Sequence, residues 1–412
     1  MHGIGLMGFG VVGSGVYEMM ENKKGPFSTY FTDAKILKVL VRDLKKARKS
    51  TCSKEMLTCD ADDLLEDSNI KTLIFAMGGT DISVEYMKRA IKNGKNIITA
   101  NKAAVAPHLK ELLELAKENN VAFFIEATTG GGMPVIDPIK QQAMLDEIYS
   151  IKGILNGTCN YILTELFKEP REFSEILKTA QELGVAEADP SDDIGGMDTA
   201  RKLGILSSIA YHKEIVIKED ELRGIETIGL QDILYLKRKG FVVKMIGCSV
   251  RENDRYDYMV SPMVLEKNSR MGQIDGAMNG VVIEGKYMDS VDFKGLGAGQ
   301  MPTANAVVSD LIRVLSGQNG WDIKLNQEHI KRDENLIEKK YYLRISDVDK
   351  TNLDNCCLEL KKFGLEISEK SENNIFYETK KMSRSELKKI VAGISSSRLK
   401  DAQSIFWAPI EI

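Results

Sequence analysis

Asp198 and Lys202 have the residue types and the spacing that proton transfer requires. The two residues are four positions apart, so a helix places them on one face. Apolar residues follow at Leu203, Ile205 and Leu206, which predicts that this helix is largely buried. On an exposed helix the pair would be a surface ion pair worth only a few tenths of a kcal/mol. In a buried helix, a lysine beside a carboxylate is suited to donate a proton to a reacting group.

A glycine-rich turn near the N-terminus predicts a dinucleotide site. Gly8, Gly10 and Gly13 form G-x-G-x-x-G between an expected strand, 3–7, and an expected helix, 11–20. Glycines there allow a tight turn and a close approach of the backbone to pyrophosphate, and the helix N-terminus favours the anion. We therefore predict that the turn binds the cofactor through Gly8, Phe9, Gly10, Val11, Val12 and Gly13.

The end of the second expected strand bears on which dinucleotide binds. Arg42 offers a planar guanidinium suited to a 2′-phosphate, and Lys45, Lys46 and Arg48 follow it. Asp43 keeps NAD as the alternative, because an acid at this place can bind the ribose 2′-hydroxyl. A solvated basic loop with no cofactor role is the third interpretation. We favour NADP.

The first third of the chain alternates expected strands with expected helices. The expected strands are 3–7, 34–41, 71–77, 96–99 and 121–127, and the helices are 11–20, 83–92 and 107–119. This alternation predicts an α/β fold with a Rossmann-type, doubly wound parallel sheet. We place the dinucleotide-binding domain at 1–130 and expect residues 298–325, which include an apolar helix, to complete it.

The rest of the chain predicts two further parts. Residues 131–297 mix helices and strands in the manner of an α+β domain. The charged stretch 326–339 is typical of a linker. Residues 340–412 then give a βαββαβ order, which predicts a small, separate module with a ferredoxin-like fold.

Composition excludes several classes of protein. Hydrophobic residues make up 43% of the 412 residues, which is ample for a packed core. The net charge of −4 argues against nucleic-acid binding, because no basic excess is available to neutralise phosphates. The longest apolar runs have the length of strands, and the N-terminus has no signal-like segment, so we expect a cytoplasmic protein without membrane contact. Six irregularly spaced cysteines and four isolated histidines form no recognisable zinc or Cys–His pattern.

Taken in order, the motifs resemble those of homoserine dehydrogenase over about residues 3–320. They are G-x-G-x-x-G at 8–13, A-N-K at 100–102, E-A-T at 126–128, N-G-T at 156–158, E-A-D-P at 187–190, D-T-A-R-K at 198–202 and G-A-G at 297–299. The C-terminal module resembles an ACT domain, which several members of that family carry. We expect a monofunctional enzyme, because no amino-kinase segment precedes the motifs.

The resemblance implies a reaction and its residues. The family reduces L-aspartate 4-semialdehyde to L-homoserine with NAD(P)H, on the route to threonine and methionine. Lys202 matches the family's proton donor, which Asp198 would orient. Glu187 matches the residue that binds the substrate's α-amino group. Residues 131–297 would thus form the substrate-binding and dimerisation domain.

Further residues follow from the same resemblance. Asp193, Gly157 and Thr158 would complete the amino-acid pocket. Lys102 would lie near the nicotinamide, either binding the cofactor or sharing in the proton transfer. Gly78 and Gly299 would contact the cofactor, with Gly299 closing over it. The remaining matches lie in a loop that resembles the family's sodium site, where Glu126, Thr129, Gly131 and Met133 would supply oxygens, mainly backbone carbonyls. The alternative for that loop is a glycine-rich hinge.

Departures from the family pattern concern regulation more than chemistry. Strand 71–77 leads into Met77-Gly78-Gly79, where the family more often has an acid before the glycines, and Cys159 replaces a common threonine. The first turn of the ACT-like module reads Asp349-Lys350-Thr351-Asn352, where ligand-binding ACT domains usually have Pro-Gly. An amino-acid effector is therefore in question, and the module could serve assembly alone. We expect a homodimer or a tetramer.

Two other functions compete with this interpretation. Another NADP-dependent semialdehyde oxidoreductase, such as aspartate-semialdehyde dehydrogenase, would need a nucleophilic cysteine with a partner base. A non-catalytic amino-acid sensor would need neither Glu187 nor the pair Asp198 and Lys202, all of which are present.

Overall fold

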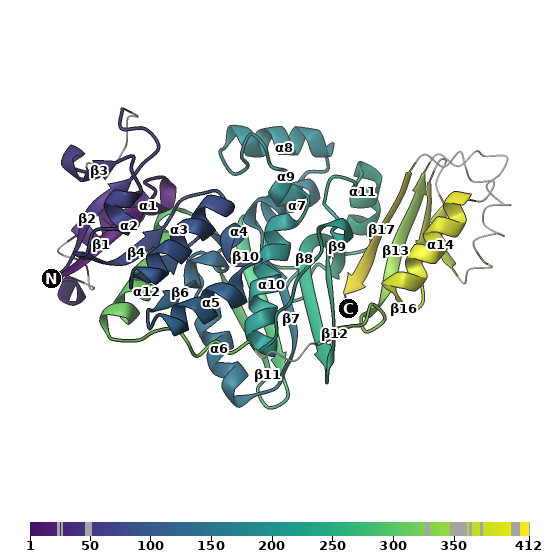
Figure 1. Ribbon diagram of the computed structural model, residues 1–412. Coiled ribbons are helices and arrows are strands. Elements are labelled where there is room, and N and C mark those ends of the chain that lie inside the picture. The colour runs from purple at the N-terminus through teal and green to yellow at the C-terminus, as the bar shows by residue number, and fades with distance from the viewer. Residues whose placement is uncertain are drawn as a thin grey trace. The chain divides into compact units, whose positions relative to one another are not determined.

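The computed structural model divides into two compact units, which are described separately. Residues 1–22, 25, 28–45, 52–325, 330–346, 361, 365–370, 374–396 and 404–411 are described. Unit 1 comprises residues 1–148, 201–216 and 281–329, and unit 2 comprises 149–200, 217–280 and 330–412. Figure 1 traces the chain from the purple strands of unit 1 to the yellow C-terminal strands of unit 2. No helix within the described part of the chain is long and apolar enough to cross a membrane.

Unit 1 contains a six-stranded parallel sheet in the order β3-β2-β1-β4-β5-β6. The strands are β1 (His2–Met7), β2 (Ala34–Leu40), β3 (Leu57–Thr58), β4 (Ile70–Phe75), β5 (Asn96–Thr99) and β6 (Phe123–Phe124). The apolar side chains of β1 and β4 are buried on both faces, because helices cover a sheet of this kind on both sides. The strand order is that of the doubly wound dinucleotide fold, so the predicted Rossmann-type sheet is confirmed.

The helices of unit 1 come from both ends of its sequence. They are α1 (Val11–Glu21), α2 (Asp62–Leu65), α3 (Asp81–Lys92), α4 (Lys102–Val105), α5 (Leu109–Glu118), α6 (Ile136–Leu145) and α12 (Gln300–Leu315). Helix α12 packs closely on α1: a Cβ on Gly15 would lie 3.0 Å from the Cβ of Ala304. Apolar residues of α12, including Val307 and Leu311, share one core with β1 and β2. The adjacent strands β10 (Met278–Gly285) and β11 (Asp289–Leu296) precede α12.

Unit 2 is built on a long antiparallel hairpin. Strands β8 (Phe241–Glu252) and β9 (Arg255–Glu266) pair along their whole length, and β7 (Ile148–Ile154) pairs with β8. The helices are α7 (Gly157–Lys168), α8 (Phe173–Glu182), α9 (Ser191–Ile194) and α11 (Leu230–Arg238). Helix α10 (Met197–Tyr211) begins in unit 2 and ends in unit 1.

The C-terminal strands have the predicted ferredoxin-like pairing. They are β13 (Glu338–Ser346), β14 (Glu366–Lys370), β15 (Asn374–Glu378), β16 (Met382–Ser383) and β17 (Ser404–Glu411), with helix α14 (Arg384–Ser396) before the last strand. The antiparallel order β17-β13-β15-β14 is that of a βαββαβ module. The expected first helix, 352–363, and the turn at 349–352 fall outside the described residues.

Two features differ from the sequence-based expectation of a linker followed by a separate module. Strand β17 pairs in parallel with β9, Ile410 opposite Val264, so the module continues the sheet of unit 2. Within the stretch 326–339, β12 (Lys331–Arg332) also pairs with β9. The charged residues of 326–339 resembled those of a linker, but Arg332 forms ion pairs with Glu221 and Asp257.

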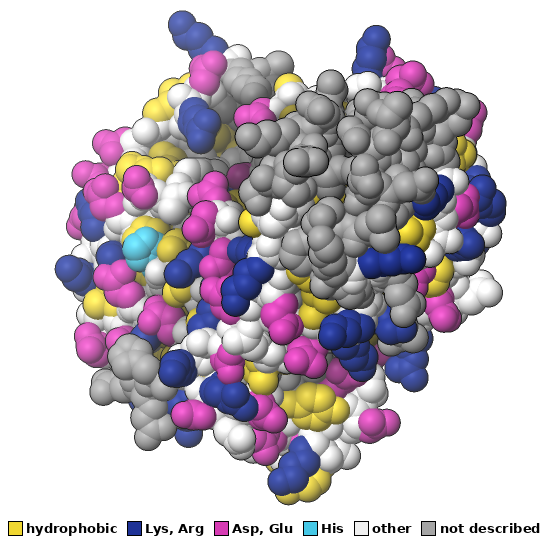
Figure 2. All heavy atoms as spheres, turned by 90° about the vertical axis from the view of Figure 1, so that its right-hand side faces the viewer, with side chains coloured by type: hydrophobic (Ala, Val, Ile, Leu, Met, Phe, Trp, Pro, Cys, Tyr) yellow, Lys and Arg dark blue, Asp and Glu magenta, His cyan; other side chains and the backbone are white. Residues whose placement is uncertain are grey.

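On the described part of the face in Figure 2, acidic and basic side chains are interspersed.

Candidate active site

The turn between β1 and α1 is built from main-chain groups. Gly8 has φ +104°, and a Cβ there would lie 2.7 Å from the carbonyl oxygen of Ala76. A Cβ on Gly13 would lie 2.2 Å from the carbonyl oxygen of Gly8. Gly10, the residue before α1, has open space around its Cβ position. Only glycine therefore fits at Gly8 and Gly13, and Gly10 leaves the helix N-terminus accessible to an anion.

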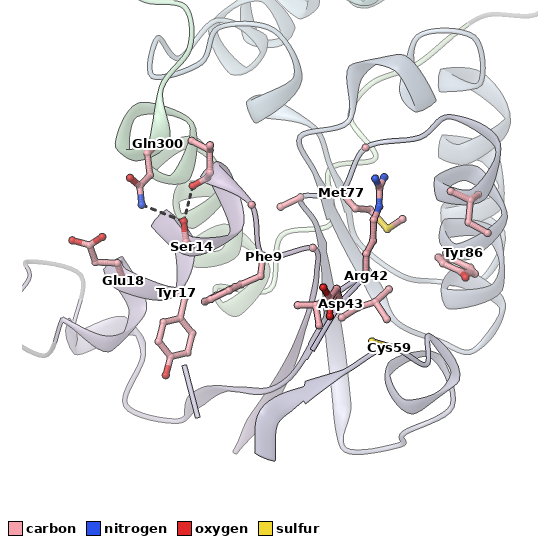
Figure 3. A pocket seen from close by; sticks show the side chains of 18 of the residues that line it. Phe9, Ser14, Tyr17, Glu18, Arg42, Asp43, Cys59, Met77, Tyr86 and Gln300 are labelled. Carbon is pink, nitrogen blue, oxygen red and sulfur yellow. Dashed lines mark hydrogen bonds between the residues drawn. The ribbon is translucent and has the colours of Figure 1, made fainter. Parts of the chain in front are cut away.

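A cavity of about 1340 Å³ opens beside this turn (Figure 3). Six of the predicted cofactor residues line it: Gly8, Phe9, Gly10, Val11, Arg42 and Gly78. The other four predicted cofactor residues, Val12, Gly13, Lys102 and Gly299, are not part of the lining. Sequence reasoning missed other lining residues, among them Tyr17, Met77, Ile82, Tyr86 and Gln300. Turn chemistry alone gives no signal for these side chains.

Arg42 and Asp43 both line the cavity, at the end of β2. Figure 3 shows them between Tyr86 on one side and Phe9 and Tyr17 on the other, with Met77 next to Arg42 in this view. The Asp43 carboxylate accepts a hydrogen bond from the Lys45 amide at 2.7 Å and so stabilises its own loop. The other basic residues expected here, at 46 and 48, lie outside the described residues.

Asn101 fixes the loop that carries Gly78. Its side-chain amide lies 3.1 Å from the Met77 carbonyl oxygen and 2.8 Å from that of Gly79, to which it donates hydrogen bonds. Its side-chain oxygen accepts from the Ala104 amide at 3.1 Å, which caps α4. Lys102 is the first residue of that short helix and is partly buried. The A-N-K motif thus joins the loop that carries Gly78 to the start of α4, where Lys102 lies.

The side chain of Glu126 is a helix cap. Its carboxylate accepts hydrogen bonds from the amides of Val135 at 2.7 Å, Ile136 at 2.9 Å and Asp137 at 3.0 Å, at the start of α6. Burial raises the pKa of Glu126, and the three amides oppose that rise. The carboxylate oxygens of Glu126 are thus engaged by backbone donors, and the predicted role of this residue as an oxygen ligand would fall to its main-chain carbonyl. The described residues contain no group of three or more His, Cys, Asp or Glu side chains arranged to hold a metal.

The loop after Glu126 is tightly folded. Gly131 has φ +61°, and a Cβ there would lie 2.5 Å from the backbone of Gly297. The Met133 amide donates to the Gly130 carbonyl at 3.0 Å. The hydroxyl oxygen of Thr129 is buried and has no hydrogen-bond partner among the described residues. Oxygen atoms of Thr129, Gly131 and Met133 therefore belong to one compact loop.

A second polar cluster lies in unit 2, where Asn156 connects Asp193 and Asp198. The Asn156 amide nitrogen donates to Asp193 Oδ1 at 2.7 Å and to Asp198 Oδ2 at 2.9 Å. Asn156 and Asp198 are each 3% exposed. Sequence reasoning placed Asn156 in a motif but gave it no role. Its position directly before α7, where asparagine caps a helix, was the available signal.

Lys202 follows Asp198 by about one turn of α10 and is 6% exposed. Leu203 and Leu206 are fully buried, so the predicted burial of this helix is confirmed. Gly157 and Thr158 begin α7, and the Thr158 hydroxyl donates to the Val185 carbonyl at 3.1 Å.

Glu187 lies between α8 and α9 with its side chain exposed.

Cys159, which replaces the threonine common in the family, is buried, and its thiol donates to the Asp193 carbonyl at 3.1 Å. A buried thiol in that setting does not suit a nucleophile.

Comparison with known proteins gives a consistent result. Residues 8–126 match the family described as homoserine dehydrogenase, NAD binding domain, and residues 134–312 match the homoserine dehydrogenase family. The homoserine dehydrogenase of Bacillus subtilis is 36% identical over 313 residues, which cover 76% of this chain and 72% of that protein.

Solved structures agree. A homoserine dehydrogenase from Thiobacillus denitrificans, 28% identical, superposes with a TM-score of 0.86 and covers 100% of this chain and 98% of that one. A hyperthermophilic archaeal homoserine dehydrogenase in complex with NADPH, 24% identical, has a TM-score of 0.64 over 77% of this chain and 98% of its own, and shares the fold. With its dinucleotide turn and its acidic cluster in place, this chain belongs to the homoserine dehydrogenase family of NAD(P)-dependent oxidoreductases.

Proposed function

We propose that Lys202 donates the proton when this enzyme reduces L-aspartate 4-semialdehyde to L-homoserine. A bound NAD(P)H supplies the hydride to the aldehyde carbon. The carbonyl π-bond breaks as that C–H bond forms, and the oxygen takes a proton from the Lys202 ammonium. The neutral amine then regains a proton from water. The observation that carries the proposal is the buried pair of Lys202 and Asp198 on one helix.

The environment of Lys202 suits that role. The ammonium stabilises negative charge that develops on the substrate oxygen, and this stabilisation is stronger in a site shielded from water. The Asp198 carboxylate, about one turn earlier in α10, favours the charged form of the lysine and orients it. Asp198 is itself held by Asn156 at 2.9 Å.

The amino-acid end of the substrate is assigned to residues of unit 2. In this proposal Glu187 binds the α-amino group, and Asp193, Gly157 and Thr158 complete the pocket. The exposure of the Glu187 side chain leaves it accessible to a ligand. Lys102, positioned by Asn101, would bind the cofactor or share in the proton transfer.

Exchange of Lys202 for methionine tests the donor. We expect Lys202→Met to lower kcat by at least about 100-fold while NADPH still binds. Lys95→Met is the matched control, because Lys95 is also buried but donates to the backbone carbonyls of Asp67 and Ile70. Wild-type turnover in Lys202→Met would refute the assignment. Turnover also distinguishes the enzyme from a non-catalytic sensor.

NADP is the proposed cofactor, with Arg42 binding its 2′-phosphate. Arg42 lines the cavity, and the Asp43 carboxylate is engaged by the Lys45 amide. The archaeal neighbour in complex with NADPH is in keeping with this choice.

A monovalent cation, sodium, is the third element of the proposal. The Thr129 hydroxyl, which is buried and has no hydrogen-bond partner in the described part of the chain, fits an oxygen ligand, together with main-chain carbonyls of the loop from Glu126 to Met133. Thermal unfolding in sodium chloride against choline chloride is the test. We expect sodium to raise the Tm of the wild type but not that of Thr129→Val, and an equal response in both proteins would refute the site.

The C-terminal module is proposed to serve assembly into a homodimer or tetramer, with an amino-acid effector as the alternative. Its pairing with β9 joins it to the sheet of unit 2. Light scattering would give the assembly state, and activity with and without threonine would detect an effector.

A further inference from the structure

Asn156 makes more hydrogen bonds than a helix cap requires. Its side-chain oxygen accepts from the Cys159 amide at 2.7 Å, which caps α7. Its side-chain nitrogen donates to Asp193 Oδ1 and Asp198 Oδ2 at 2.7 and 2.9 Å. An amide nitrogen carries two hydrogens, so each carboxylate receives one. The reversed amide would set its oxygen against two carboxylates and its nitrogen against an N–H, so the partners fix the orientation.

The amide occupies the place where two negative charges converge. Asp193 belongs to α9 and Asp198 to α10, and both carboxylates lie within 2.9 Å of one nitrogen atom. Like charges at short range repel each other, and the repulsion is less screened here because Asp198 is buried and Asp193 is half-buried. A neutral group that donates to both carboxylates offsets that repulsion and sets the direction of each one.

The backbone of α9 is held by other contacts. The Cys159 thiol donates to the Asp193 carbonyl at 3.1 Å, and the Ile225 amide donates to the Ile194 carbonyl at 2.9 Å. Removal of the Asn156 amide would therefore remove one hydrogen bond from each carboxylate while these contacts keep α9 in place.

We propose that Asn156 is a positioning residue, which holds the carboxylates of Asp193 and Asp198 in the orientations that catalysis requires. The proposal rests on the function proposed above, in which Asp198 orients Lys202 and Asp193 belongs to the substrate pocket. Asn156 touches neither substrate nor cofactor in this account. Loss of the hydrogen bond to Asp198 would lower kcat, because Asp198 orients Lys202. Loss of the hydrogen bond to Asp193 would raise KM, because Asp193 belongs to the substrate pocket.

Two exchanges separate positioning from helix capping. Serine caps helices as well as asparagine does, but its side chain is too short to reach both carboxylates. Asn156→Ser therefore keeps the cap and loses the two donors, whereas Asn156→Ala loses both functions. We expect a similar kinetic defect in both variants: kcat lower by about 10-fold, KM for homoserine higher by about 10-fold, and NADPH binding retained. Asn156→Ala should have the lower Tm of the two variants, because it loses the helix cap as well as the two donors.

Asn93→Ser is the matched control. The Asn93 amide also donates to a carboxylate, that of Glu66 at 3.3 Å, and to the Leu65 carbonyl at 3.0 Å. Asn93 is not among the residues assigned to the cofactor site or to the substrate site. We expect its kcat and KM to equal those of the wild type.

The same assays on Asp193→Asn and Asp198→Asn distinguish this proposal from the one on which it rests. If these aspartate variants are impaired and Asn156→Ser is not, positioning by Asn156 is overturned and the proposed roles survive. If the aspartate variants turn over like the wild type, the roles and the positioning both fail. A defect confined to Asn156→Ala would assign Asn156 to capping alone and would also overturn the proposal.

Discussion

The dinucleotide turn presents main-chain groups, whereas the acidic cluster consists of side chains from three separate segments. In the turn, Gly8 and Gly13 let the backbone fold so closely that a Cβ would lie 2.7 or 2.2 Å from a carbonyl oxygen. In the cluster, Asn156 joins Asp193 and Asp198 by hydrogen bonds of 2.7 and 2.9 Å.

This difference determines how each region responds to substitution. A site made of main-chain atoms is sensitive to added side-chain volume, because a backbone carbonyl cannot rotate out of the way as a side chain can. A site made of buried polar side chains is sensitive to the loss of a partner, because the remaining groups are left unsatisfied. Exchanges that add volume or remove a charge therefore probe the two regions separately.

The largest effect is expected at the turn. Gly13→Ala forces a Cβ against the Gly8 carbonyl, and overpacking of this kind costs about 1–3 kcal/mol. We expect a lower Tm without cofactor and an NADPH Kd raised by about 10- to 100-fold. Gly10→Ala is the informative partner, because its Cβ meets nothing within 4 Å in the protein but would meet a bound pyrophosphate.

Gly10→Ala should thus keep the Tm of the cofactor-free protein and still weaken NADPH binding. Fluorescence titration and thermal unfolding give the two quantities. Unchanged NADPH affinity in Gly10→Ala would mean that the pyrophosphate does not bind at this turn.

The sequence predicted the turn because its requirements are local. The spacing of three glycines between a strand and a helix specifies both the backbone conformation and the ligand, without knowledge of distant residues. The walls of the cavity were not predictable in the same way. Tyr86 and Gln300 reach it from α3 and α12, and only the folded structure shows that residues so distant in the sequence line one cavity with Gly8.

The acidic cluster was predicted in part, for a related reason. Asp198 and Lys202 are neighbours on one helix, so their spacing is visible in the sequence. The bridge from Asn156 spans 37 and 42 positions and depends on how α9 and α10 pack. The Glu126 side chain shows the same limit, because no local pattern indicates that its carboxylate caps α6 through the amides of Val135, Ile136 and Asp137.

An effect limited to one cofactor, and without a loss of stability, is expected from Arg42→Ala, which removes charge from the cavity without altering the turn. A guanidinium–phosphate contact contributes about 1.5–3 kcal/mol, so we expect kcat/KM with NADP to fall by about 10- to 100-fold and kcat/KM with NAD to change little. Lys45→Ala is the control, because Lys45 is an exposed basic residue outside the cavity lining. Equal losses with both cofactors would contradict the 2′-phosphate assignment.

The smallest effect on activity, with a clear effect on stability, is expected at Glu221. Its carboxylate forms a bidentate ion pair with Arg332 of β12 and a 3.0 Å contact with Arg384 of α14. Burial opposes ionisation, but the two guanidinium groups prevail and lower the pKa of Glu221 from 4.5 to about 2. The folded protein therefore favours the ionised form, and the pKa difference corresponds to about 3 kcal/mol of stability at neutral pH.

The sign of the pH dependence follows from that shift. Because the pKa is lower in the folded than in the unfolded chain, the contribution is complete above about pH 4.5 and disappears as pH falls through about 2. We expect Glu221→Gln to lower the free energy of unfolding by about 3 kcal/mol at pH 7, and the difference from the wild type to narrow on acidification. Urea unfolding between pH 3 and 7 measures this. A constant difference across that range would mean that packing, and not the charge of Glu221, joins β12 and α14 to the rest of unit 2.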